Sequence, residues 1–177
     1  MGKRQRVESS RTNEVARTGD ARAEVTGIGE VPGKSHYLIG NDSARWHRNV
    51  RAFERVRYDT VYPGIDLEFH GSQGAMEYDF VVAPGADPSD IRIGFEGAAL
   101  VNIEPDGQLT LELPGGGTLI NREPVVYQQL KGEQQLIDGR FVRLGATEFG
   151  FALGAYDPSI ELTIDPMLEY STQFGGS

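Results

Sequence analysis

Four carboxylates lie close together in two short alternating segments, and they are the residues of this chain best suited to chemistry. They occupy alternate positions within each segment: Asp66, Glu68, Glu77 and Asp79. Alternation of polar with apolar residues predicts β-strands, whose successive side chains point to opposite faces of a sheet. The four acids are therefore expected on one face. Acids about 5 Å apart could serve a retaining glycosidase, and carboxylate oxygens could also ligate calcium.

A β-hairpin is predicted to position these acids. Its strands are Ile65 to His70 and Ala75 to Val82, and Gly71 to Gly74 supplies the reversal. The predicted cross-strand pairs are Asp66 with Asp79 and Glu68 with Glu77, and the opposite face carries Ile65, Leu67, Phe69, Met76, Tyr78 and Phe80. Because like charges directly opposite one another destabilise a sheet, the acidic face requires counter-charges or a cation.

Three interpretations of the acidic face follow from this pattern. Catalytic carboxylates need a cleft that separates their pKa values, and regular strands do not provide one. Calcium takes six to eight oxygen ligands, and a loop of the DxDxDG type does not occur in the chain. We prefer the third interpretation, a ladder of charges in which arginines on neighbouring strands neutralise the acids. The candidate partners are Arg55, Arg57 and Arg92.

The remaining candidate residues carry weaker signals. Trp46, the only tryptophan, is expected to fill one end of the core, and the alternative is an exposed platform on which a sugar stacks. The histidines His36, His47 and His70 lack the close spacing of a zinc motif. A GxSxG nucleophile motif and cysteine are both absent from the sequence. We therefore predict that the protein is not an enzyme and has no cofactor, with calcium as the alternative.

Composition narrows the class of protein. The chain has 177 residues and a formal net charge of −9, which argues against nucleic acid as a partner. Apolar runs long enough to cross a membrane as a helix do not occur in it. Residues 1–25 are polar and rich in arginine, and no apolar segment follows them, so we expect a disordered arm and no signal peptide.

Short alternating segments separated by glycine and proline turns fill the rest of the chain. About a dozen strands at intervals of about ten residues predict an all-β fold, an antiparallel β-sandwich, over residues 26–166. Asn41, Asp42 and Ser43 are predicted to cap a single helical turn over residues 44–47. A fixed internal repeat was not found, so a propeller built from this chain alone is not expected.

Four strings of sequence carry a resemblance to a known family. They are HYLIGNDSARWHRNV, the stretch from VRYDTVYPGIDLEFH to IRIGFEGA, EPVVYQQL, and IDPMLEYSTQFGGS. Together they resemble the all-β domain of unknown function that precedes SBBP-type β-propeller repeats in bacterial secreted and cell-surface proteins. LEYSTQFGGS is similar to the opening of such a repeat, so residues 167–177 are expected to begin a truncated one.

The resemblance implies a context and no catalytic residues. We expect a non-enzymatic structural or interaction module, outside the cell or on its surface, that is a fragment of a longer chain with a β-propeller downstream. Its partner would be a protein or a surface glycan. The alternative functions are a carbohydrate- or calcium-dependent adhesion module, with Trp46 as ligand contact, and a glycoside hydrolase fragment.

Overall fold

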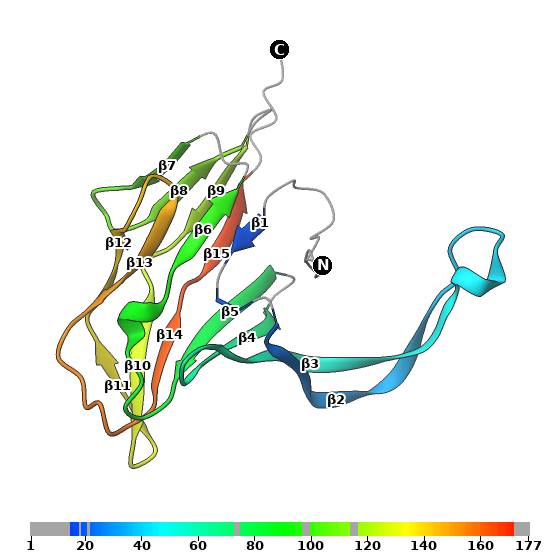
Figure 1. The fold of residues 1–177 in the computed structure, drawn as a ribbon, viewed down its shortest axis with the longest axis horizontal. Helices are drawn as coiled ribbons and strands as arrows, with labels where there is room; N and C mark the ends of the chain where they lie inside the picture. Colours follow the sequence, from blue (N-terminus) through cyan, green and yellow to red (C-terminus); the bar gives the residue numbers. More distant parts are fainter. Residues whose placement is uncertain are drawn as a thin grey trace.

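The computed structural model describes residues 15–17, 19–20, 22–72, 75–96, 100–113 and 117–171 (Figure 1). These residues form antiparallel strands and two 3-10 helices, which confirms the predicted all-β class. The elements are β1 (Val15–Arg17), β2 (Glu24–Tyr37), η1 (Ser43–Arg45), β3 (His47–Tyr62), β4 (Ile65–Ser72), β5 (Ala75–Val82), η2 (Pro88–Asp90), β6 (Ile93–Glu96), β7 (Leu100–Ile103), β8 (Leu109–Glu112), β9 (Thr118–Asn121), β10 (Val125–Leu130), β11 (Glu133–Ile137), β12 (Gly139–Arg143), β13 (Glu148–Leu153), β14 (Leu162–Asp165) and β15 (Leu168–Ser171).

The strands are arranged in three sheets. The largest has seven strands in the order β11-β10-β14-β5-β4-β3-β2, and the two smaller ones have the orders β1-β6-β13-β12 and β15-β9-β8-β7. The predicted hairpin therefore lies near the middle of the large sheet. On its other side, β5 pairs with β14. These two strands are far apart in sequence, and strands of both smaller sheets lie between them in the chain.

The hydrophobic core joins one face of the large sheet to the two smaller sheets, in a sandwich-like arrangement. Ile65 and Phe80 on that inner face have no exposed surface. The Phe80 ring lies 5.8 Å from the ring of Phe151 in β13, measured between centroids. Leu109 and Leu111 of β8 are also fully buried. The alternation read from the sequence thus assigns the inner face of the hairpin correctly.

The register of the hairpin differs from the predicted one by two residues. Ser72 pairs with Ala75, so β4 is two residues longer than expected and includes Gly71 and Ser72, which were predicted as turn, whereas β5 has its predicted bounds. Glu68 consequently lies opposite Asp79, His70 lies opposite Glu77, and Asp66 lies opposite Val81. A shift of two positions leaves every side chain on its predicted face, because the side-chain period of a strand is two.

Strands β2 and β3 extend beyond the body of the molecule as a long two-stranded ribbon (Figure 1). β3 pairs with β4 only from Arg55 onward, so residues 28–54, which we call the arm, have no other sheet neighbour. The arm has no buried residue. The eight residues of β3 before Arg55 correspond to a reach of about 25 Å at the rise of a β-strand.

Local contacts hold the arm together in place of a core. The ring of Phe53 lies against Gly27 on the paired strand, where a side chain would not fit. The guanidinium of Arg51 lies over the Phe53 ring, 5.0 Å from its centroid, and is also paired with the carboxylate of Glu30. Because an isolated two-stranded hairpin is marginally stable in water, these contacts explain how the ribbon persists away from the body.

Trp46 lies at the end of the arm, so the prediction that it fills one end of the core is wrong. The predicted single helical turn exists, but it covers Ser43–Arg45 and not residues 44–47, so Trp46 follows it. Asp42 caps η1, and its side chain accepts from Ala44 N at 3.0 Å. The indole Nε1 of Trp46 donates to Gly40 O at 3.0 Å, and Arg48 lies 5.2 Å from the ring centroid. A large aromatic side chain is usually buried in a core, but Trp46 contacts Gly40 and Arg48, which are close to it in sequence.

The two ends of the described chain take part in sheets. Residues 1–14, part of the N-terminal segment predicted to be disordered, lie outside the described residues. Within the same segment β1 pairs with β6, and β2 begins at Glu24, before the predicted boundary at residue 26. At the other end β15, within the predicted repeat start at 167–177, pairs with β9. Residues 172–177 lie outside the described residues.

Candidate functional site

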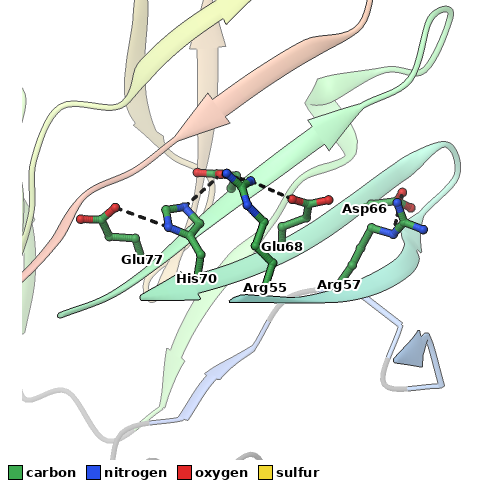
Figure 2. Close-up of polar contacts among 7 residues, drawn as sticks. Arg55, Arg57, Asp66, Glu68, His70 and Glu77 are labelled. Carbon is green, nitrogen blue, oxygen red and sulfur yellow. Dashed lines mark hydrogen bonds and ion pairs between the residues drawn. The ribbon is translucent and has the colours of Figure 1, made fainter. Parts of the chain in front are cut away.

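The face of the large sheet that points away from the core carries the four predicted carboxylates. They come from two adjacent strands, Asp66 and Glu68 from β4 and Glu77 and Asp79 from β5. β14 contributes a fifth acid, Asp165, because the pairing of Ile164 with Phe80 continues to Asp165 beside Asp79. We call these five acids, together with Arg55, Arg57 and His70, the acidic face; Figure 2 shows part of it.

Arg55 supplies the central counter-charge. Its Nη1 donates to Glu68 Oε2 at 3.1 Å and lies 3.9 Å from Asp79 Oδ2. The side chain of Arg55 is 48% exposed, whereas those of Glu68 and Asp79 are 13% and 9% exposed. The more exposed arginine therefore supplies positive charge to two largely buried carboxylates, as predicted for a charge ladder. Figure 2 shows its contact with Glu68.

Arg57 and Asp66 form a second contact, further along the sheet (Figure 2). Arg57 Nε donates to Asp59 Oδ1 at 2.7 Å and lies 3.9 Å from Asp66 Oδ2. Asp66 Oδ1 also accepts from the backbone N of Thr60 at 2.7 Å. Thr60 has φ of 54°, at an irregularity where the β3–β4 register shifts. Asp66 therefore stabilises a strained bend in β3, which is a structural role.

His70 lies between two acids of β5. Its Nε2 is 3.1 Å from Asp79 Oδ2, and its Nδ1 is 3.7 Å from Glu77 Oε2. The imidazole therefore bridges two carboxylates of the neighbouring strand. The sequence indicated only that His70 lacks the spacing of a zinc motif, because its neighbours become visible only in the observed register.

Asp79 and Asp165 are the two acids with the least favourable surroundings. Each has a buried Oδ1 atom without a hydrogen-bond partner. Burial raises the pKa of Asp165 to about 6, and the negative charges of Asp79 and Glu77 act in the same direction. Burial also raises the pKa of Asp79, although His70 and Arg55 oppose that shift. The outcome is a pair of neighbouring carboxyl groups that resist double ionisation.

Asp165 was missed by sequence reasoning. It directly follows the run IELTI, residues 160–164, and precedes Pro166, and nothing in that local pattern marks it as a neighbour of the hairpin. Only the antiparallel pairing of β14 with β5 brings it beside Asp79.

Arg92 was predicted as a third counter-charge, and this prediction is wrong. Arg92 lies in the connection between η2 and β6, and within the described part of the chain it forms no ion pair with the acidic face. Its backbone O and N instead contact the Tyr62 hydroxyl at 2.8 and 3.0 Å. Arg92 does alternate with apolar residues, as the sequence indicated. It precedes β6, however, which belongs to a smaller sheet and not to the sheet that carries the acidic face.

The geometry of the acidic face is that of a ladder of pairs across strands. Within the described ranges, no group of three or more His, Asp or Glu side chains is arranged to hold a metal ion. The predicted ligand contact Trp46 lies on the arm, away from the four weak calcium candidates, so the structure does not bring the predicted site residues into one place. The described residues include no helix of the length and apolar character needed to span a membrane.

Comparisons with known proteins place the chain in a family. Neither the curated proteins nor the solved structures gave a match. A family model described as a domain of unknown function, DUF7948, matches residues 3–167, which is most of the chain. The acidic face and the described strands β1 to β14 lie within that match, and β15 follows it. The chain therefore belongs to the DUF7948 family of domains of unknown function.

Proposed function

We propose that this chain is a non-enzymatic interaction module of a bacterial secreted or cell-surface protein that carries β-propeller repeats of the SBBP type. The cellular location and the propeller context rest on the sequence resemblance described in the first section. The mode of action rests on the arm, which is the observation that carries the proposal.

The arm ends in apolar side chains that the fold does not cover. Tyr37, Leu38 and Ile39 are 52%, 53% and 76% exposed, at the point of the molecule furthest from the core. Adjacent exposed apolar residues on a projecting element are typical of a contact surface, because their exposure to water carries a cost that a partner would relieve. We assign the binding surface to residues 37–46, which we call the tip.

The acidic face supports the absence of catalysis. Arg55 pairs with Glu68 and lies near Asp79, and His70 lies between Asp79 and Glu77. A glycosidase needs one free carboxylate and one protonated carboxyl in an open cleft, with different environments. Assays of the purified protein on glycan and peptide panels are expected to show no hydrolysis. Hydrolysis that Glu68→Gln or Glu77→Gln removes would overturn the proposal.

The tip can be tested without knowing its partner. At low protein concentration in about 500 mM salt, where binding through the tip does not contribute, replacement of Leu38 and Ile39 by serine is expected to leave the melting temperature within about 2 °C of the unmodified protein, because neither side chain packs in the fold. Ile164→Ala, in the core, is the control and is expected to lower it by several degrees. If the tip variant melts like the core variant, the tip serves folding and not binding.

A calcium-dependent adhesion module is the second candidate. The observation in its favour is that Asp79 Oδ1 and Asp165 Oδ1 are buried without a partner. Bound calcium would stabilise the folded state by mass action. Thermal unfolding in millimolar calcium and in EDTA separates the candidates. Equal melting temperatures support the charge ladder, and a higher value in calcium that Asp165→Asn abolishes supports the adhesion module.

A further inference from the structure

Charge is distributed very unevenly along this chain. Residues 63–177 contain 5 Lys and Arg against 18 Asp and Glu, a net charge of −13. The segment 43–51, SARWHRNVR, contains three arginines and no acid. That segment is the end of the arm, next to the exposed side chains of Tyr37, Leu38 and Ile39. Residues 37–51 contain these three arginines against one acid, Asp42, a net charge of +2, and Arg51 is paired with Glu30. The tip and its flank therefore combine exposed apolar side chains with a small net positive charge.

The outer face of the large sheet has the complementary character. Beside the five acids of the acidic face it carries Glu161, which is exposed just before β14. Arg55 and Arg57 are two cations against these six acids, so they neutralise only part of this charge. The same face also presents two exposed apolar side chains. Leu136 is 71% exposed and is paired with Tyr127, and Val125 is 40% exposed and is paired with Asp165.

The arm projects away from the body of its own molecule (Figure 1). It is continuous with the edge of the large sheet, so the tip and the acidic centre of the face are separated by the length of the arm. A second molecule related by a two-fold axis could receive the tip on its acidic face while its own tip docks in return. Such an isologous arrangement makes the same contact twice and closes as a dimer.

We propose that the tip of the arm docks on the outer face of the large sheet in a second copy of this chain. Arg45 and Arg48 meet the surplus acids of that face, and Leu38 and Ile39 cover the exposed Val125 and Leu136. This inference rests on the proposed function and names its partner. Charge complementarity between two surfaces of the same chain carries it.

Salt dependence tests the proposal on the unmodified protein. Sedimentation equilibrium over a concentration series is expected to show a monomer–dimer equilibrium at about 50 mM salt. The dimer dissociation constant is expected to rise at least about tenfold at about 500 mM salt, because salt screens exposed charges. A monomer at every concentration and salt level would overturn the proposal, and so would a dimer that salt does not weaken.

A charge exchange tests the docking geometry. The tip variant Arg45→Glu/Arg48→Glu and the face variant Glu77→Lys/Glu161→Lys are each expected to weaken self-association at least about tenfold, because each brings like charges together. Mixed together, the two variants are expected to form a heterodimer, since both contacts then join opposite charges. Glu112→Lys/Glu148→Lys, exposed on β8 and β13, is the control with the same change of net charge and is expected to dimerise at least as well as the unmodified protein.

The outcomes separate this inference from the proposed function. If the mixture of tip and face variants fails to associate while both fold, as judged by circular dichroism, the second copy is not the partner. The proposed function then still stands if the serine variant of the tip melts like the unmodified protein. If that variant is destabilised, the proposed function fails as well, because the tip then belongs to the fold.

Discussion

At the level of single residues, the acidic face combines well-paired and poorly paired carboxylates. Glu68 and Asp66 accept from neighbouring donors and have defined structural partners. Asp79 and Asp165 lie beside one another with buried oxygen atoms that nothing satisfies. Two such groups are most stable with one proton between them, because a shared proton removes a charge and supplies a donor.

Asp165 makes stability depend on pH with an unusual sign for an acid. Its folded-state pKa is raised from 3.8 to about 6, so the folded state holds a proton that the unfolded state has lost. The contribution is full below about pH 4 and is lost as pH rises to about 6. Asp165→Asn is expected to raise the free energy of unfolding at pH 7 by about 1 kcal/mol, after allowance for solvent screening.

Urea unfolding at pH 4 and pH 7 measures this difference. The gain from Asp165→Asn should be present at pH 7 and absent at pH 4, where Asp165 is protonated in the unmodified protein. Equal gains at both pH values would show that the effect comes from packing and not from the carboxylate.

Arg55 and Arg92 give a matched pair for the charge ladder. Arg55→Gln leaves Glu68 and Asp79 without their cation and is expected to lower the free energy of unfolding by about 1 kcal/mol at pH 7. Arg92→Gln has the same change of charge but breaks no ion pair with the acidic face, so we expect a change within about 0.5 kcal/mol. Equal losses in the two variants, measured by urea unfolding, would show that only net charge matters.

At the level of elements, close packing of strands explains where side chains are excluded. Gly139 of β12 lies against Val126 of β10, so a methyl group there would overlap the Val126 Cγ2 atom. Gly139→Ala is expected to cost about 1–3 kcal/mol of stability through overpacking. Gly71 of β4 has open space around it, and Gly71→Ala is the control, expected to be neutral or mildly stabilising. Chemical denaturation of both variants tests this, and equal effects would contradict it.

At the level of the whole molecule, stability is concentrated in the body. The strands β5 and β14 contain Phe80 and Ile164, which have no exposed surface, whereas the arm has no buried residue. Opening of the arm therefore exposes little apolar surface and costs little free energy.

Hydrogen exchange should reveal this division. In about 500 mM salt, which suppresses association through the tip, backbone amides of residues 31–52 are expected to exchange at least about a hundredfold faster than those of β5 and β14. The β3–β4 ladder from Arg55 onward should be intermediate. Protection of the arm equal to that of β5 under these conditions would contradict the description of the arm as an uncovered ribbon.

The sequence alone determined the class of fold and the faces of the central hairpin. Alternation assigned Ile65, Leu67 and Phe80 to the core and the four acids to the opposite face, because strand geometry links sequence parity to direction. That assignment survived a register error of two residues, since such a shift preserves parity. The arginines of β3 were also identified, because β3 leads directly into β4 and pairs with it.

Only the tertiary structure decided which strands lie side by side. Asp165 reaches Asp79 through a pairing between strands far apart in sequence, and Arg92 lies next to a different sheet. Trp46 lies on an arm whose existence depends on β3 continuing past the edge of β4. Such pairings depend on the free energy of the whole core, and local alternation carries no information about them. The acids of the hairpin could thus be found from the sequence, whereas Asp165, the neighbouring acid whose pKa burial raises, could not.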